Sequence, residues 1–416
     1  MNWISIIPPK FQKYASFGVI PKLLLAPVAF LILCGFLLLK PFVHLRLYRM
    51  IDTRIGHLAT NTELVRLKNF SEHKNANRKE VIVYCSESKI CSNTALRQMF
   101  VRNSLLFKGH TAWLLVNMAH KIRLFNSVSS HGNKELSVDI DGLLSKYPPT
   151  ISFNQKEIET GEKFLSQFSL NKNKLVCLFV RDSEYFKHSL HINDIYHEYR
   201  NSSISTYVAA SEILASLGYN VLRMGAKVKE PLHTESQLVF DYAYRGCRTE
   251  LLDVYLGAVS RFNIVTASGW DSVPTIFRRP IMRVNHLPIF QPSSLSINML
   301  IYPKLLIDKA THSVLTLSKI IKMGIVKSQN TLQYSEAQVE IRDLSSEELV
   351  EAVTEMAQRV EGTFVETPEQ KEMQAKLKHI LSTHPKLQPS PNYFPIRAQF
   401  ASCFLSRYPN FLDGLD

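Results

Sequence analysis

The chain has 416 residues, which is long enough for two α/β domains of ordinary size. Its six cysteines include no CxxC pair and mostly lie in apolar surroundings, which fits reduced thiols in a cytosolic compartment. The formal net charge of +13 belongs to the first third of the chain, because residues 1–136 hold 19 Lys/Arg and 6 Asp/Glu, whereas residues 137–416 hold 30 of each. This asymmetry indicates an anionic partner for the N-terminal part, either nucleic acid or a membrane surface.

A long apolar segment lies within this basic region. Residues 23–39 (LLLAPVAFLILCGFLLL) carry no charge and are bracketed by Lys22 and Lys40. Their length is at the lower limit for crossing a bilayer and Pro27 can kink the helix, so a single span and an interfacial anchor both stay open. The apolar run starts late and no small-residue cleavage site closes it, which disfavours a cleavable signal peptide. Residues 1–49 are therefore predicted to associate with a membrane, and an anionic membrane surface is favoured over nucleic acid.

The soluble part begins near residue 50, and residues 50–170 predict a first α/β domain. Two apolar runs, residues 81–84 (VIVY) and 112–116 (AWLLV), have the composition of buried strands, and residues 93–102 between them have that of a helix. This alternation is typical of an open parallel sheet. A helix over residues 155–168 then leads out of the domain as a linker.

Residues 171–344 predict a second α/β domain with the same rhythm. Its first strand is apolar throughout, as expected for a strand that is covered on both faces. Its first helix is expected to end at Gly218, since glycine is the usual residue just beyond a helix C-terminus. The expected strands cover residues 175–180, 220–224, 238–240 and 262–266 and a stretch after Pro280, and the expected helices cover residues 203–217 and 251–259.

Residues 345–416 predict C-terminal helices and a tail. Helical spacing of apolar residues covers 345–361, with Ser345 or Ser346 as the N-cap, and a second helix covers 368–381. Two Rossmann-like domains that face a cleft, with an N-terminal hydrophobic anchor and C-terminal bracing helices, describe the GT-B architecture. The sequence therefore predicts an α/β protein of the GT-B class.

Residues that can bind a diphosphate follow several strands of the second domain. Arg181 and Asp182 follow the first strand, Arg223 ends the second, and a turn of small residues, Ser268-Gly269, follows the fourth. Because ligands bind open α/β sheets at the carboxyl ends of the strands, these groups are predicted to surround one pocket. Arginine can grip two phosphate oxygens, and helix-start amides beside a glycine can meet phosphate as well. An exposed charged loop or an ordinary βαβ corner is the alternative for each feature taken alone.

Further polar residues lie near the same strand ends. Residues 194–201 (DIYHEYRN) mix aromatic and polar side chains that can hold a sugar, although a solvated helix start explains them too. Asp271 can either cap the following helix or bind a ribose or sugar hydroxyl. The remaining predicted donor-binding residues are Arg200, Asn201, Gly225 and Asp241.

Two residues are candidates for the base that deprotonates an acceptor hydroxyl. His57 lies in a glycine-containing turn, residues 54–58 (RIGHL), before an expected helix over 61–67, and histidine titrates near neutral pH. Asp182 is the rival base, and a purely structural histidine is the alternative for His57. Three further histidines match no common closed metal site, so no metal is predicted; these are His188, His191 and His197.

Seven segments occur in this order along the chain: RIGHL (54–58), YHEYRN (196–201), GYNVLRMG (218–225), FDYA (240–243), DVYL (253–256), SGWDSVP (268–274) and RRPIMRVN (278–285). Taken together they resemble a bacterial family described as surface-polysaccharide glycosyltransferases, over roughly residue 40 to the C-terminus. More distantly, FVRDSEY (179–185) and residues 253–269 are similar to the arginine strand and donor helix of GDP-fucose-dependent GT-B transferases. Phe179 stands where those enzymes carry a histidine and Asp182 where they repeat the arginine, so the resemblance leaves the donor open.

These observations predict a metal-independent glycosyltransferase, of the EC 2.4 class, at the cytoplasmic face of the inner membrane. It would move a sugar from a nucleotide-sugar donor, a co-substrate rather than a cofactor, to a lipid-linked or growing surface glycan. The competing hypotheses are a sugar-nucleotide epimerase or phosphotransferase on the same fold, and a non-catalytic membrane scaffold of a polysaccharide assembly complex. Nucleic acid is not expected as a partner. The donor base and sugar, the acceptor, the stereochemistry and the oligomeric state stay open.

Overall fold

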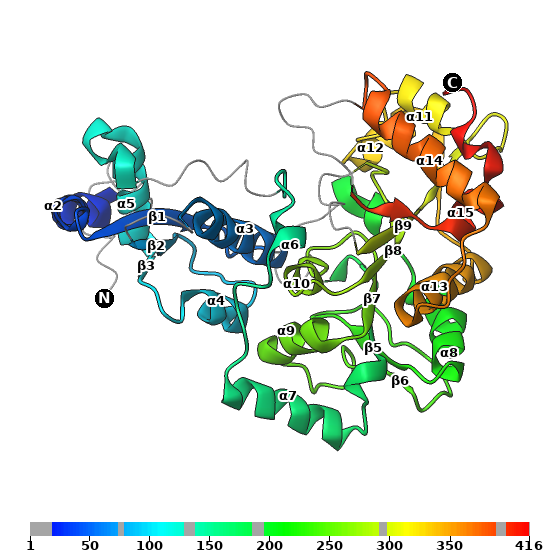
Figure 1. Cartoon of the computed structure of the whole chain (residues 1–416), viewed down its shortest axis with the longest axis horizontal. Helices are drawn as coiled ribbons and strands as arrows, with labels where there is room; N and C mark the ends of the chain where they lie inside the picture. The colour runs from blue at the N-terminus through cyan, green and yellow to red at the C-terminus, as the bar shows by residue number, and fades with distance from the viewer. Residues whose placement is uncertain are drawn as a thin grey trace, which may run out of the picture. The chain divides into compact units, whose positions relative to one another are not determined.

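The computed structural model describes residues 19–73, 79–128, 138–184, 195–290, 298–387 and 397–415 (Figure 1). The chain forms two compact units. The first comprises the residues up to 137 together with 150–152, and the second comprises residues 138–149 and everything from 153 onward. The expected domain boundary at residue 170 lies inside the second unit, shortly before its first strand.

The first unit is built on a three-stranded parallel sheet in the order β1-β2-β3. Strands β1 and β2 pair along their whole length, from Val43 opposite Lys79 to Met50 opposite Ser86. The elements are α2 (Val19–Leu39), β1 (Val43–Met50), α3 (Ile55–His73), β2 (Lys79–Ser86), α4 (Thr94–Val101), β3 (Leu106–Lys108), α5 (Gly109–Lys121) and the 3-10 helix η2 (Arg123–Val128).

One predicted strand of this unit is wrong. Residues 112–116 lie in α5, where Ala112, Leu115 and Ala119 recur at helical spacing on the buried face. A short apolar run has the same composition in a buried helix as in a buried strand, so only the longer periodicity separates the two. The strand over residues 81–84 is confirmed by β2. The helix over 93–102 is confirmed by α4, whose first turn is capped by the Asn93 side chain.

The second unit is built on a seven-stranded sheet in which every neighbouring pair of strands is parallel. The strand order is β12-β9-β8-β7-β4-β5-β6. The α/β class with parallel sheets is therefore confirmed, and so is the N-terminal apolar helix. The strands are β4 (Leu175–Phe179), β5 (Asn220–Met224), β6 (Val239–Phe240), β7 (Phe262–Val265), β8 (Ile281–His286), β9 (Met299–Pro303) and β12 (Gln399–Phe400), and a separate antiparallel pair is formed by β10 (Leu305–Asp308) and β11 (Val339–Arg342).

Helices cover both faces of this sheet, with α9 and α10 on one side and α8 and α13 on the other (Figure 1). The predicted helix over 203–217 begins as a 3-10 turn and becomes α8, and it ends before Gly218, whose φ of +81° is the left-handed conformation expected there. The helices are α6 (Leu143–Lys146), α7 (Gln155–Gln167), α8 (Val208–Ser216), α9 (Glu250–Val259), α10 (Ser272–Ile276), α11 (Leu317–Lys322), α12 (Thr331–Glu336), α13 (Ser346–Glu361), α14 (Pro368–Thr383) and α15 (Ser402–Arg407), and the 3-10 helices are η4 (Lys172–Lys174), η6 (Ile195–Arg200), η7 (Ile204–Tyr207) and η8 (Pro409–Leu412).

The C-terminal helices belong to the second unit. Ser345 is the N-cap of α13 and forms a capping box with Glu348, as the sequence predicts for this start. One face of α13 is buried and packs against α8, β8 and α15 of the same unit. Helix α14 begins at a second capping box, made by Thr367 and Gln370.

Candidate functional site

The strand order of the second unit creates a crevice at its centre. From β4 the chain first moves outward to β5 and β6, then returns to the other side of β4 and continues outward through β7, β8 and β9. Neighbouring strands β4 and β7 therefore send their following loops in opposite directions at their carboxyl ends. In open α/β sheets this reversal point is where ligands, and dinucleotides in particular, bind.

The two sides of this crevice are joined by two hydrogen bonds. The backbone N–H of Arg181, just after β4, donates to Thr266 Oγ1 at 2.8 Å, and the Thr266 N–H donates to the Phe179 carbonyl at 3.0 Å. The Ser268-Gly269 turn follows directly after Ala267. Among the described residues no partner is found for the buried Ser268 hydroxyl oxygen. A buried hydroxyl without a partner is unusual and indicates a ligand or water in this turn.

The 3-10 helix η6 brings two arginines to the crevice. The guanidinium of Arg181 donates to the carbonyl of His197 in η6 at 3.0 Å and to the side chain of Asn201, the residue after η6. Arg200 donates through Nε to the Ala267 carbonyl at 2.9 Å, so its side chain lies beside the Ser268-Gly269 turn. In the described part of the chain Arg200 has no carboxylate partner and no other hydrogen bond, which leaves its two terminal nitrogens for a ligand.

A buried ion pair flanks the same turn on the β8 side. Asp271, in the N-cap position of α10, makes no side-chain cap bond, so the capping hypothesis for this residue is wrong. Its carboxylate instead accepts from Arg283 of β8 at 2.7 Å, and both side chains are buried. Nearby His286 is also buried, and burial, followed by the charges of Arg283 and Arg200, holds its pKa well below the usual value. The imidazole is therefore neutral at physiological pH.

A cavity of about 310 Å³ opens on the other side of β4, at the carboxyl ends of β4 and β5. Asp182, Asn201 and Arg223 are among its lining residues. Both carboxylate oxygens of Asp182 accept backbone N–H groups, from Glu184 at 3.0 Å and from Lys229 at 2.9 Å. Asp182 thus fixes the loops around the cavity mouth.

Arg223 lies at the same sheet edge but is tied into the protein. It is 1% exposed, and it pairs with Asp241 at 3.2 Å and donates to the Glu230 carbonyl at 2.8 Å. Gly225, which follows β5, is needed for the turn itself, since a Cβ there would lie 2.6 Å from a methyl carbon of Val228. The predicted convergence therefore brings Arg181, Arg200 and Ser268 together, whereas Arg223 and Asp241 neutralise each other one strand away.

His57 belongs to the first unit, in the first turn of α3. Its imidazole is partly buried, and Nδ1 lies 3.4 Å from Asn61 Oδ1. Burial is the main reason that the pKa of His57 is below its ordinary value. His188, His191 and Asp194 lie outside the described residues.

Sequence reasoning missed a polar cluster at the carboxyl edge of the first unit's sheet. Asp52, two residues beyond β1, is 1% exposed and accepts from Ser86 Oγ at 2.6 Å and from Arg97 at 2.9 Å. The signal that was available is the alternation of apolar and polar residues in VHLRLYRM (43–50), which predicts β1 and with it a polar strand end. Arg283, Thr266 and Lys304 of the second unit were also missed; buried Lys304 pairs with Asp343 at 2.6 Å.

No protein-family model matches the chain, and no curated protein matches its sequence. Five chains of solved structures match it, and three of them are described here. Escherichia coli ADP-heptose LPS heptosyltransferase II is 14% identical with a TM-score of 0.40, covering 62% of this chain and 90% of its own. A glycosyl transferase family 9 protein of Veillonella parvula is 12% identical with a TM-score of 0.44, covering 76% of this chain and 97% of its own. An E. coli heptosyltransferase with ADP-2-deoxy-2-fluoro heptose is 11% identical with a TM-score of 0.30, covering 62% and 92%. Likeness of this size leaves the function to be argued from the site.

Proposed function

We propose that the chain is a GT-B glycosyltransferase that moves a sugar from a nucleotide-sugar donor to a lipid-linked or growing surface glycan. The observation that supports it best is Arg200, a half-buried guanidinium fastened through Nε to the Ala267 carbonyl at the reversal point of a parallel sheet. Its terminal nitrogens have no partner in the described residues, and the buried Ser268 hydroxyl beside Ala267 has none either. Two neighbouring donors at such a crevice fit the oxygens of a diphosphate.

The charges around the turn suit a diphosphate leaving group. Asp271 is neutralised by Arg283, so the carboxylate nearest to the turn does not oppose an anion. His286 is neutral and adds no charge of either sign. The guanidinium of Arg200 and the free amides of the Ser268-Gly269 turn would therefore stabilise the charge that develops as the sugar leaves. The proposal requires no metal ion for that step.

His57 is the better of the two candidate bases. With its pKa below the ordinary value, the imidazole is unprotonated near neutral pH and can accept a proton from an acceptor hydroxyl. Both oxygens of Asp182 are instead engaged by backbone N–H groups of the loops around the cavity. In this proposal the membrane-associated first unit meets the acceptor at the cytoplasmic face of the inner membrane.

A thermal-shift screen of the full chain against nucleoside diphosphate sugars tests this proposal. At 100 times Kd a ligand adds about 2.7 kcal/mol of stability, and a chain of this size gains about 3–5 °C from that. Arg200→Met should abolish the shift. Arg245→Met removes the same charge from an exposed position and should keep it.

Product analysis then separates the enzyme classes. A transferase consumes the donor only slowly without an acceptor, whereas an epimerase converts it with no acceptor present. If none of the donors stabilised the wild-type chain, the scaffold hypothesis would be favoured. If Arg200→Met responded like the wild type, the diphosphate site would have to lie elsewhere. The resemblance to GDP-fucose enzymes makes the guanosine donors the first to include in the panel.

A further inference from the structure

Helix α2 has two apolar faces with different environments. Ala29, Leu33 and Phe36, spaced four and three residues apart, are at most 6% exposed. Leu24, Leu31 and Leu38 lie on the opposite face and are 73%, 69% and 77% exposed. Residues seven apart return to nearly the same side of a helix, so these three leucines form one stripe along its whole length. The stripe is uncharged, runs along most of the helix and is largely exposed.

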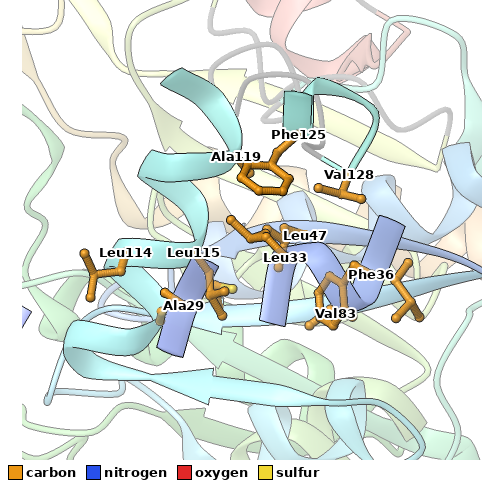
Figure 2. Close-up of a cluster of buried hydrophobic side chains, with 13 residues drawn as sticks. Ala29, Leu33, Phe36, Leu47, Val83, Leu114, Leu115, Ala119, Phe125 and Val128 are labelled. Atoms are coloured by element: carbon orange, nitrogen blue, oxygen red, sulfur yellow. The ribbon is translucent and has the colours of Figure 1, made fainter. Parts of the chain in front are cut away.

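The buried face makes α2 a structural part of the first unit. Its side chains enter a core formed with β1, β2, α5 and η2, as Figure 2 shows for Leu33, Phe36, Leu115 and Phe125. The Phe30 and Phe125 rings meet edge to face, with centroids 5.4 Å apart. A helix that served only as a membrane anchor would have no such core. Removing α2 from these neighbours would expose their apolar surface to water.

This packing is incompatible with a membrane-spanning orientation. By length and composition alone residues Pro21–Leu39 are sufficient to cross a bilayer. However, Phe30 lies near the middle of that segment, and its partner Phe125 belongs to a turn that carries exposed Arg123. If α2 crossed the bilayer, Arg123 and the exposed Lys121 would be carried close to the hydrocarbon centre, where charged side chains are costly.

Basic side chains lie close to α2. Lys22, inside the helix, is held over the Trp113 ring at 4.0 Å, and Lys40 directly follows the helix. Lys121 and Arg123 are exposed on either side of the adjacent turn, next to Leu124, which is itself exposed. An exposed apolar strip in the part of the chain that holds the whole net positive charge matches the acyl and headgroup layers of an anionic membrane.

We propose that α2 lies in the plane of an anionic membrane, with the stripe of Leu24, Leu31 and Leu38 inserted among the lipids and the rest of the first unit at the surface. This membrane contact involves the first unit alone and does not depend on the transferase activity. Of the two orientations that the sequence leaves open, it selects the interfacial anchor over the membrane span. Every point of the stripe is then equally deep, whereas in a spanning helix Leu31 would be about 10 Å deeper than the other two.

Depth measurement distinguishes these geometries. A fluorescent amino acid would be introduced at position 24, 31 or 38 of the full chain, and its quenching by spin-labelled lipids would be measured in phosphatidylglycerol–phosphatidylcholine vesicles. Equal, shallow depths at the three positions are expected. A deepest position 31 would mean a spanning helix and overturn the proposal. Absence of quenching at all three positions would mean that protein covers the stripe, which overturns it too.

Vesicle co-flotation provides a second readout with matched variants. Replacing Leu24, Leu31 and Leu38 together by Gln should weaken binding to the anionic vesicles by about 100-fold or more, because three leucines leave the hydrocarbon. These side chains contribute little to the core, so the variant should keep the thermal stability of the wild type in detergent. Unchanged binding by this folded variant would overturn the proposal. The control carries Gln at three exposed leucines elsewhere, Leu105, Leu217 and Leu332, and should bind like the wild type.

Discussion

The ion pair between Asp271 and Arg283 allows a quantitative test of how the crevice is held. The two charged groups are 2.7 Å apart, and their side chains are 6% and 3% exposed. Arg200 lies close enough to disfavour the charge on Arg283. Replacing Asp271 by Ala would remove this carboxylate from a buried guanidinium that has a second guanidinium nearby. Breaking a buried pair in this way typically costs about 3–5 kcal/mol.

A loss of that size is a large part of the total stability, which for a folded domain is about 5–15 kcal/mol. At about 2 °C per kcal/mol for a unit as large as the second one, Tm should fall by roughly 6–10 °C. Urea unfolding of Asp271→Ala, followed by circular dichroism, measures the change directly. Asp413→Ala removes an exposed carboxylate and should change the unfolding free energy by less than about 0.5 kcal/mol.

A double substitution distinguishes the loss of the ion pair from the loss of the side-chain volume that the pair fills. Asp271→Leu combined with Arg283→Met replaces both charges by apolar groups, and it should recover most of the lost stability, because the desolvation cost disappears along with the attraction. The reasoning would be refuted if Asp271→Ala kept the wild-type unfolding free energy and lost nucleotide-sugar binding. That result would restore the alternative hypothesis, in which Asp271 binds a ribose or sugar hydroxyl.

Two further expectations concern the second unit. Burial raises the pKa of Asp253 to about 6 despite its ion pair with Arg248. The folded chain therefore binds this proton more tightly than the unfolded chain does. The free energy of unfolding should fall by about 3 kcal/mol as pH rises from about 4 to about 6. Urea titrations across that range should show this slope in the wild type and not in Asp253→Asn; an equal slope in both would disprove the assignment. Gly161→Ala should destabilise the chain by about 1–3 kcal/mol, because a Cβ there would lie 2.2 Å from the Tyr255 ring. Thermal unfolding checks it against Lys163→Ala, an exposed change on the same helix, and equal Tm values would contradict the packing argument.

The sequence predicted the second unit better than the first, for a physical reason. Strands β4 and β5 are buried on both faces, so they read as short apolar runs between glycines and polar turns. In the first unit β1 contains the basic residues Arg46 and Arg49, and the apolar run over 112–116 belongs to α5, which buries one face against α2 and the sheet. Strands that carry charged residues and short apolar runs within helices are the two cases in which local composition misleads.

The site was predictable only in part, because strand order is not a local property. Arg181 and Thr266 follow neighbouring strands but are 85 residues apart in sequence, and the Thr266 side chain joins the two strand ends. Nothing local to Arg223 shows that Asp241 on the next strand neutralises it. The sequence therefore predicted that these groups share one sheet edge and could not identify which cations remain available for a ligand.

The surroundings of each arginine explain why Arg200, which is available to a ligand, comes from the 3-10 helix η6 and not from a strand. A cation on a central strand such as β5 or β8 is surrounded by packed neighbours, and it is stable there only with a counter-charge: Arg223 has Asp241, and Arg283 has Asp271. Arg200 lies at the end of η6 and is half-exposed, so water solvates its charge and no counter-charge is needed for stability. A ligand phosphate can then replace water at Arg200 without first breaking an internal pair. Donor affinity should therefore depend on Arg200 more strongly than on either strand arginine, and strand-arginine substitutions should act mainly through stability.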